Sequence, residues 1–283
     1  MLNRKLPSFL AAAGLAVAVF AVTAGTASAA GLSRCNGGTT APTSIAPGTY
    51  DSLEISGFCQ LDSGNVRVKH NLTILPGGGL NAAFSGSNLT VGGDVRVQRD
   101  GILILGCEPN AFPCFNDPNG NTGGTPGMQT NDTIGHNLIA SDAMMVLLHR
   151  NRIGGSVTQQ GGGGGVTCAS QPLGPNGPPA YTTYEDNVIG GRVSIRGLRT
   201  CWAGFFRNDL SSDLSWRDNL EADEDGNEIA TNNIEGNLSC SGNDPAPQLG
   251  DSVQVGNTLN TVQGDVSGQC VGLAFPHEDN HQH

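Results

Sequence analysis

Lysine is almost absent from this sequence: its 283 residues include only Lys5 and Lys69, and the formal net charge is −11. A chain with this charge is a poor partner for the phosphate backbone of a nucleic acid. Aromatic residues make up 5 % of the chain, and its apolar residues do not recur with a helical period. The G-x-S-x-G motif of the α/β-hydrolases is missing, which excludes a nucleophile elbow of that class. Glycine, by contrast, is abundant at 42 residues, which indicates a tightly turning chain.

The first 29 residues have the three parts of a secretory signal peptide. Arg4 and Lys5 precede an apolar run over residues 9–22, and small residues end the segment at Ala29;. We expect cleavage after Ala29 and a secreted, extracellular protein without a stable membrane span. Removing two of the 14 basic residues leaves 12 against 25 acidic residues, a net charge of −13.

One pattern recurs through the rest of the chain, and residues 187–195 show it most clearly. Asn187 is followed at every second position by an apolar residue, a glycine and two further apolar residues. Taking the first apolar position as a mark, nine copies have their marks at residues 49, 68, 91, 134, 153, 189, 210, 234 and 262. Steps near 20 residues with period-2 alternation predict an all-β protein, a β-solenoid of about nine coils.

The spacing of these copies also predicts the domain organisation. A single solenoid domain is expected over residues 30–276, with long loop insertions near 107–131 and 160–184 and a flexible tail over 277–283. Both insertions are rich in glycine and proline, which favours loops over helices. Insertions in a solenoid project from one face, so these two are the first place to look for a binding surface.

Most copies carry an asparagine two residues before the mark. If the coils are in register, these positions form one stacked column, made of Asp132, Asn151, Asn187, Asn208, Asn232 and Asn260. Side-chain amides stacked in this way bond to one another and to backbone groups that a buried turn leaves without partners. The alternative is that asparagine is present only because it favours turns.

All eight cysteines follow the signal peptide, which favours disulfides over a metal site or a nucleophile. Stacked coils favour four pairings: Cys35 with Cys59, Cys107 with Cys114, Cys168 with Cys201, and Cys240 with Cys270. The last two pairs are expected at similar depth in successive coils, where the strand spacing of about 4.8 Å suits a disulfide. The first and last would close the two ends of the solenoid.

Two segments resemble metal sites. His277 to His281 reads H-E-D-N-H, but it follows a proline and lies in a polar tail, so we expect no zinc-protease helix there;. Residues 221–228 space acidic side chains as a calcium loop does, with Asp223 and Asp225 as candidate ligands;. The position of the bidentate glutamate is taken by Asn232, which favours a solvated acidic turn. No other cofactor is indicated.

Aromatic and charged residues gather near residue 200. Trp202 with Arg199 and Arg207 could stack and bind a sugar, whereas Trp216 is at an inward position and is expected in the core. A polysaccharide-cleaving enzyme would need carboxylates across one groove. Asp209, Asp213 and Asp218 are candidates on adjoining strands, and Arg192 and Arg196 point outward beside them.

The C-terminal repeats, residues 232–247 and 256–270, repeat Gly-Asn-hydrophobic around a pair of cysteines. In this they resemble a group of uncharacterised secreted proteins of high-GC Gram-positive bacteria, and more vaguely the bactofilins. The resemblance implies a right-handed parallel β-helix and no known activity. The signal peptide, disulfides and insertions differ from bactofilins.

Two functions are therefore compatible with the sequence. The first is a secreted structural or adhesive solenoid that binds a cell-wall or extracellular polysaccharide or a surface protein without catalysis. The alternative is a polysaccharide-acting β-helix enzyme, a lyase or a glycoside hydrolase. The enzyme, unlike the binding protein, requires the outward arginines and carboxylates to converge in one groove.

Overall fold

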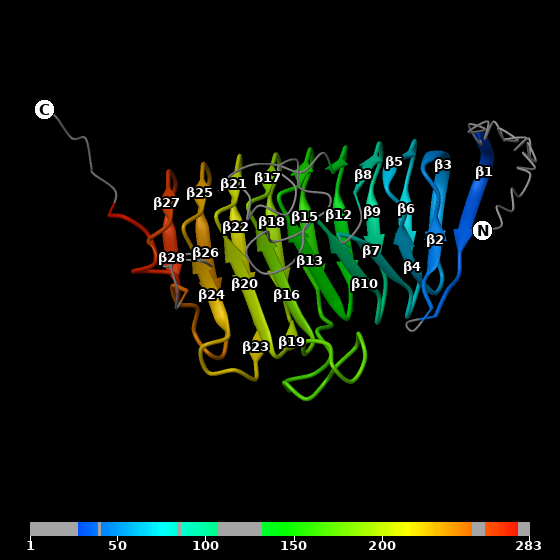
Figure 1. Cartoon of the computed structure of the whole chain (residues 1–283). Helices are drawn as coiled ribbons and strands as arrows, with labels where there is room; N and C mark the ends of the chain where they lie inside the picture. Colours follow the sequence, from blue (N-terminus) through cyan, green and yellow to red (C-terminus); the bar gives the residue numbers. More distant parts are fainter. Residues whose placement is uncertain (1–27, 39–40, 84–85, 107–131, 251–257, 277–283) are drawn as a thin grey trace, which may run out of the picture.

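The computed structural model describes residues 28–38, 41–83, 86–106, 132–250 and 258–276, and these residues form an all-β structure without helix. Their 28 strands form two large parallel sheets and one short strand pair. The strands stack along one long axis, with the N-terminal strand at one end and the C-terminal strand at the other (Figure 1). The described residues contain no helix long and apolar enough to cross a membrane.

The 18-stranded sheet consists of two rows, because each coil crosses it twice with a corner between the crossings. The first row contains β5 (Gly64–Val68), β8 (Ser87–Val91), β11 (Thr133–Ile134), β14 (Arg152–Ile153), β17 (Val188–Ile189), β21 (Asp209–Leu210), β25 (Asn233–Ile234) and β27 (Thr261–Val262). The second row contains β6 (Leu72–Ile74), β9 (Val95–Val97), β12 (Leu138–Ser141), β15 (Val157–Gln160), β18 (Val193–Arg196), β22 (Leu214–Arg217), β26 (Leu238–Ser241) and β28 (Val266–Gly268). The longer β1 (Ser28–Cys35) and β3 (Gly48–Ile55) span both rows.

The third row is the eight-stranded sheet, which completes each coil. It contains β2 (Thr43–Ile45), β4 (Phe58–Leu61), β7 (Gly79–Ala82), β10 (Ile102–Leu105), β13 (Met145–His149), β16 (Tyr181–Glu185), β20 (Trp202–Phe206) and β24 (Asn227–Ala230). The short β19 (Arg199–Thr200) and β23 (Leu220–Glu221) pair with each other between the second and third rows. A chain that visits three rows in turn, always parallel to its own previous coil, fits a β-solenoid.

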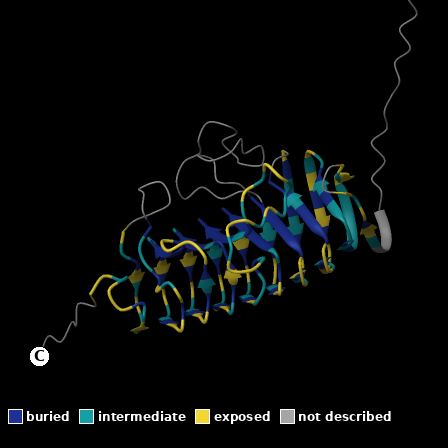
Figure 2. Cartoon of the chain, turned by 90° about the horizontal axis from the view of Figure 1, so that it is seen from below, coloured by how far each residue is buried: buried dark blue, intermediate teal, exposed yellow. Residues whose placement is uncertain are grey.

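Strand register aligns the repeated apolar positions coil upon coil. Ile153 pairs with Ile189, then Leu210, Ile234 and Val262 along the first row. All but Val262 of these are buried in the core. Figure 2 shows that buried residues run through the strands while exposed residues gather at the turns.

The mark expected at residue 49 is wrong by one residue. Val68 pairs with Tyr50, not Thr49, although Leu53 pairs with Leu72 as the repeat predicts. The corner within β3 is therefore one residue shorter than the others. The ring of Tyr50 packs partly on the core. Sequence alternation had assigned this inward position to its smaller neighbour, Thr49.

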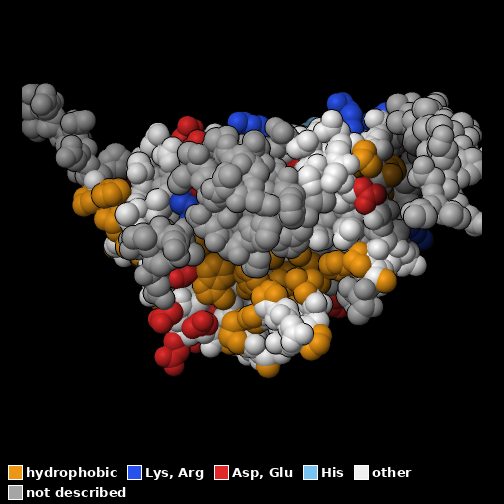
Figure 3. Space-filling view, viewed as in Figure 1, with side chains coloured by type: hydrophobic (Ala, Val, Ile, Leu, Met, Phe, Trp, Pro, Cys, Tyr) orange, Lys and Arg blue, Asp and Glu red, His pale blue; other side chains and the backbone are white. Residues whose placement is uncertain are grey.

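The third row is buried on both faces over much of its length. Its inward residues join the main core, while Ile102, Ile104, Met145 and Leu147 point outward and form a second apolar cluster. Leu173 and Ala180 of the second insertion belong to this cluster. Figure 3 shows apolar side chains in a band over this sheet. Strands buried on both faces lack alternation, so the nine-copy repeat did not reveal this row.

Three disulfides lie in the described part of the chain: Cys35–Cys59, Cys168–Cys201 and Cys240–Cys270, with Cα separations of 6.5, 4.6 and 5.2 Å. Cys168 lies in the second insertion rather than at the depth of a coil, so its disulfide fastens this insertion to the solenoid. The expected pair Cys107–Cys114 lies outside the described residues.

The second insertion covers residues 161–180, shorter than expected at both ends because β15 and β16 continue into it. The backbone N–H groups of Gly163 and Gly165 donate to the carbonyls of Ala143 and Arg199. The first insertion, residues 1–27 of the expected signal peptide and the tail 277–283 lie outside the described residues, while Ser28 and Ala29 begin β1.

Candidate functional site

From Asn151 to Asn260 the asparagine column forms a continuous hydrogen-bonded ladder between the third and first rows. Asn232 is representative: its Oδ1 accepts from the backbone N–H and the Nδ2 of Asn208, at 2.9 and 3.1 Å. Its Nδ2 donates to Oδ1 of Asn260 and to the carbonyl of Phe205, both at 2.8 Å. Asn187 and Asn208 repeat these bonds at 2.8–3.2 Å, and Asn151 repeats the two donor bonds of the amide. The amides of Asn187, Asn208 and Asn232 thus both donate and accept, which few side chains of this size can do.

The two ends of the ladder use other groups. Asp132 Oδ1 accepts from the backbone N–H of Leu89 at 2.6 Å. Asn260 Nδ2 donates to the carbonyls of Ile229 and Leu273, at 3.0 and 2.7 Å, so residues after the last strand close this end. All six side chains of the column are at most 2 % exposed.

The ladder compensates for an unfavourable backbone conformation. Arg150, Asp186, Arg207 and Thr231 directly precede ladder asparagines and have φ between 52 and 62°. Non-glycine residues in this left-handed region cost on the order of 1 kcal/mol or more each. The hydrogen bonds of the following asparagine fix this turn in these four coils.

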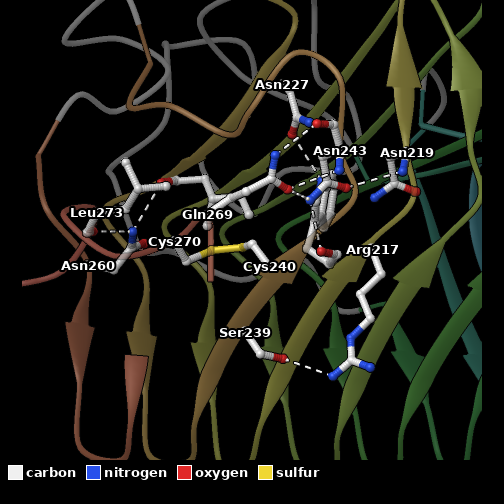
Figure 4. The surroundings of a disulfide bond; sticks show 12 residues. Arg217, Asn219, Asn227, Ser239, Cys240, Asn243, Asn260, Gln269, Cys270 and Leu273 are labelled. Carbon is white, nitrogen blue, oxygen red and sulfur yellow. Dashed lines mark hydrogen bonds between the residues drawn. A yellow bond between two sulfur atoms is a disulfide. The ribbon is translucent and has the colours of Figure 1, made fainter. Parts of the chain in front are cut away.

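Two further polar columns, which the sequence analysis missed, stabilise the other corners. At the corner after the second row, Asn219 Oδ1 accepts from the N–H of Leu198, Asn243 Oδ1 from that of Asn219, and Gln269 Oε1 from that of Asn243, at 2.9–3.1 Å (Figure 4). At the corner between the first two rows, Asn137 and Asp213 accept similar bonds from the next coil. The sequence did contain a signal for these two columns, because their residues follow the ladder position after a nearly constant number of residues.

A polar groove lies on the outer face of the second row over its last four strands. We call it the serine groove: it has a volume of about 550 Å³ and is lined by Arg192, Ser194, Asp213, Ser215, Arg217, Asn237, Ser239, Asp265 and Ser267. The four serines pair in register across β18, β22, β26 and β28. Their hydroxyls therefore repeat at about 4.8 Å, the spacing of neighbouring strands.

Asp213 forms part of one side of the serine groove. The backbone N–H of Asn237 donates to its carboxylate at 2.9 Å, and Arg192 forms an ion pair with it at 2.7 Å. Together they lower the pKa of Asp213, although partial burial opposes this change. A carboxylate held ionised by these partners is suited to accept hydrogen bonds and unsuited to act as a general acid.

The outward residues that a catalytic groove would need do not converge. Arg192 and Asp213 line the serine groove, whereas Arg196 and Asp218 line a separate, shallower hollow of about 220 Å³. Asp209 lies on the first row and accepts from Asn233 Nδ2 at 2.9 Å. The acidic residues 223–225 lie in the turn between β23 and β24.

The expected sugar-binding group of Trp202, Arg199 and Arg207 is not a single site. Trp202 and Arg207 lie at opposite ends of β20, and Arg199 is on β19. Trp202 is half-buried, stacks on Phe206 at 5.8 Å and donates to Glu228 at 2.9 Å. Arg207 forms ion pairs with Glu185 and Asp186 at 2.8 and 2.9 Å. Burial raises the pKa of Glu185 even though Arg207 lowers it, so Arg207 stabilises a buried acidic pair.

The expected calcium ligands occupy a tight turn. Asp223 Oδ1 accepts from the backbone N–H of Asp225 at 3.2 Å, and both side chains are exposed. Among the described residues no group of three or more histidine, cysteine, aspartate or glutamate side chains is arranged to hold a metal ion. The H-E-D-N-H segment lies outside the described residues.

A buried polar chain connects the core to Glu221. Trp216 Nε1 donates to Asn227 Oδ1 at 3.0 Å, and Asn227 Nδ2 donates to Glu221 Oε2 at 3.1 Å and to the carbonyl of Pro245 at 2.9 Å. Glu221 Oε1 is buried and has no hydrogen-bond partner in the described part of the chain. Burial, with the charge of Asp244, raises the pKa of Glu221 to about 8. This carboxyl is shielded from solvent, so it lacks the access that a catalytic acid needs.

Glu221 makes stability depend on pH. Its pKa is higher in the folded chain than its ordinary value of 4.5, so the folded state binds the proton more tightly. The stabilisation is complete at low pH and is lost as pH rises from about 4.5 to 8, by at most about 1.4 kcal/mol per pH unit. Glu221→Gln should therefore raise the melting temperature relative to wild type at pH 8 and above, and change it little at pH 4.5.

Thermal unfolding at a series of pH values measures this effect. Glu224→Gln is the matched control, because Glu224 is exposed in the adjacent turn and should leave the pH profile unchanged. Parallel profiles for wild type and Glu221→Gln would contradict the assignment.

The chain matches no protein-family model, no curated protein and no solved structure.

Proposed function

We propose that this protein is a secreted right-handed parallel β-helix that presents a rigid binding surface outside the cell and does not catalyse a reaction. The right-handed path is the one that parallel crossover connections take in nearly all known cases. The signal-peptide pattern over residues 1–29 supports export, and three disulfides are compatible with an oxidising compartment;. The ligand class is a cell-wall or extracellular polysaccharide, or a surface protein.

The observation that carries the proposal is how the chemically capable side chains are used. Asp213, Glu185 and Asp186 are held by arginines, Asp209 by an asparagine, and Glu221 is buried. The outward arginines and carboxylates are divided between two hollows. The repeated coils supply a stiff frame, because every corner is hydrogen-bonded to the next coil.

The test is an activity assay of the exported protein against pectin, xylan, chitin, alginate and cell-wall glycan, with and without calcium. We expect no turnover of any of these substrates. Turnover that disappears in Asp209→Asn, Asp213→Asn or Asp218→Asn would contradict the proposal and favour the alternative, a polysaccharide lyase or glycoside hydrolase. An exported protein that begins near Ala30 would support the secretion part separately.

A further inference from the structure

Arg196 and Arg217 are an exceptional pair on the outer face of the second row. Strand register places them directly opposite each other on β18 and β22. They are the one pair of like charges opposed in this way among the strand pairs of the described residues. Like charges directly opposite each other destabilise a sheet, so the arrangement has a cost that folding alone does not explain.

Neither arginine is neutralised within the described structure. Arg196 donates to Gln160 Oε1 at 2.7 Å, and Arg217 makes one long bond of 3.5 Å to Ser239 Oγ, visible in Figure 4. Among the other described basic residues, Arg34, Lys69, Arg96, Arg192 and Arg207 each form an ion pair with a carboxylate, while Arg67, Arg99, Arg152 and Arg199 form none within the described residues. No carboxylate of the described residues lies within ion-pair distance of Arg196 or Arg217, although Asp142 and Asp218 line the hollow beside Arg196. Both arginine side chains are exposed.

The two arginines lie beside the row of serine hydroxyl groups in the serine groove. Arg217 lines the serine groove, and Arg196 lines the adjoining hollow. The serines lie between the two arginines and an opposite wall made of Arg192, Asp213, Asn237 and Asp265, on which Arg192 is ion-paired with Asp213. The first wall therefore carries two guanidinium groups that can donate to anions. On the second wall, Asp265 forms no ion pair within the described residues, so this wall can accept from hydroxyl groups, and the serines between the walls both donate and accept.

We propose that the serine groove, together with Arg196, binds an acidic polysaccharide whose chain lies across the coils. The two guanidinium groups bind carboxylates of the sugar units, because the planar guanidinium matches a carboxylate in a bidentate geometry. The serines and Asp265 on the opposite wall bind the sugar hydroxyls. The inference rests on the proposed function as a binding solenoid and names its ligand class.

The two-sided charge of the groove explains the choice of ligand. A nucleic acid carries a phosphate on every nucleotide and few free hydroxyl groups, so it would leave the wall with Asp265 without hydroxyl donors;. A neutral glycan would leave both guanidinium groups without an anion. A polymer that carries both carboxylates and free hydroxyls satisfies both walls.

The experiment measures binding of the exported protein to immobilised polygalacturonate, alginate, dextran sulfate, DNA and neutral dextran. We expect binding to polygalacturonate or alginate that weakens as salt increases, and little binding to neutral dextran. The double variant Arg196→Gln/Arg217→Gln should weaken binding about tenfold or more, since it removes two charge-assisted contacts.

The matched control is Arg67→Gln/Arg152→Gln, which changes the net charge equally. Arg67 and Arg152 are exposed on first-row strands β5 and β14, outside the groove. This variant should bind as wild type does. Equal losses in the two double variants would indicate a general charge effect and overturn the proposal, as would unchanged binding in Arg196→Gln/Arg217→Gln.

The remaining outcomes separate this inference from the proposed function. Binding to dextran sulfate alone would assign sulfate as the anion and overturn the carboxylate assignment. Binding to neutral dextran, to DNA or to none of the polymers overturns the inference but leaves a non-catalytic solenoid standing. Turnover of a polymer would instead contradict the proposed function.

Discussion

Replacing Asn232 with alanine should lower the free energy of unfolding by about 3 kcal/mol or more, since each buried group left unpaired costs about 1–3 kcal/mol. The change removes four hydrogen bonds. It leaves the backbone N–H of Asn208 and one N–H of its Nδ2 without their acceptor and removes one donor from the carbonyl of Phe205, in a buried region. The asparagine amide can satisfy all of them at once because it has two donors and an acceptor.

Asn233→Ala is the control for this change. Asn233 is the adjacent residue, is exposed, and bonds only through an exposed pair with Asp209, so it should change stability by less than about 0.5 kcal/mol. Chemical denaturation measures both variants. Hydrogen exchange should also show weaker protection of the Asn208 amide in Asn232→Ala. Equal stability of the two variants would mean that asparagine is present only because it favours turns.

The sequence was sufficient for the repeated part of the fold because this part obeys two local rules. Alternation places Val193 and Ile195 inward, and the register pairs them with Leu214 and Trp216 as the repeat requires. The asparagine offset from the mark stays constant in four successive coils because the backbone turn, with its left-handed residue, is the same in each of them. A feature that repeats with fixed spacing is visible in a single sequence.

The third row and the location of Cys168 could not be predicted from the sequence, for physical reasons. The third row is covered on its outer face, so strands such as β10 are apolar at every position and carry no period-2 signal;. Cys168 was assigned the depth of a coil, but it lies in a loop whose path no repeat specifies.

The serine groove depends on register across four coils. Ser194, Ser215, Ser239 and Ser267 belong to one column only after the strands are paired. A single outward serine in a strand is not informative. That Arg196 lies directly opposite Arg217 becomes apparent only when β18 is paired with β22. Sequence reasoning instead selected Arg207, whose charge is neutralised by Glu185 and Asp186.

The second large effect is expected at Trp216, the largest fully buried side chain. Its ring packs edge-on against Phe205 at 6.3 Å, and its Nε1 holds Asn227, which in turn holds Glu221. Trp216→Ala should lower the free energy of unfolding by about 4 kcal/mol or more, from the cavity and from the unpaired Asn227 oxygen. Trp216→Phe keeps most of the apolar contact and should cost about half as much.

Trp202→Ala is the matched control, because Trp202 is the other tryptophan of the chain and lies on the outer face of β20. It should cost about 1–2 kcal/mol, from lost stacking on Phe206 and the lost bond to Glu228;.

Each variant leaves one tryptophan as a fluorescent reporter. The emission of Trp216 in Trp202→Ala should be shifted to shorter wavelength and resist quenching by acrylamide, whereas Trp202 in Trp216→Phe should be quenched more readily. A larger loss of stability in Trp202→Ala than in Trp216→Ala would show that the inward and outward faces of these coils had been assigned in reverse.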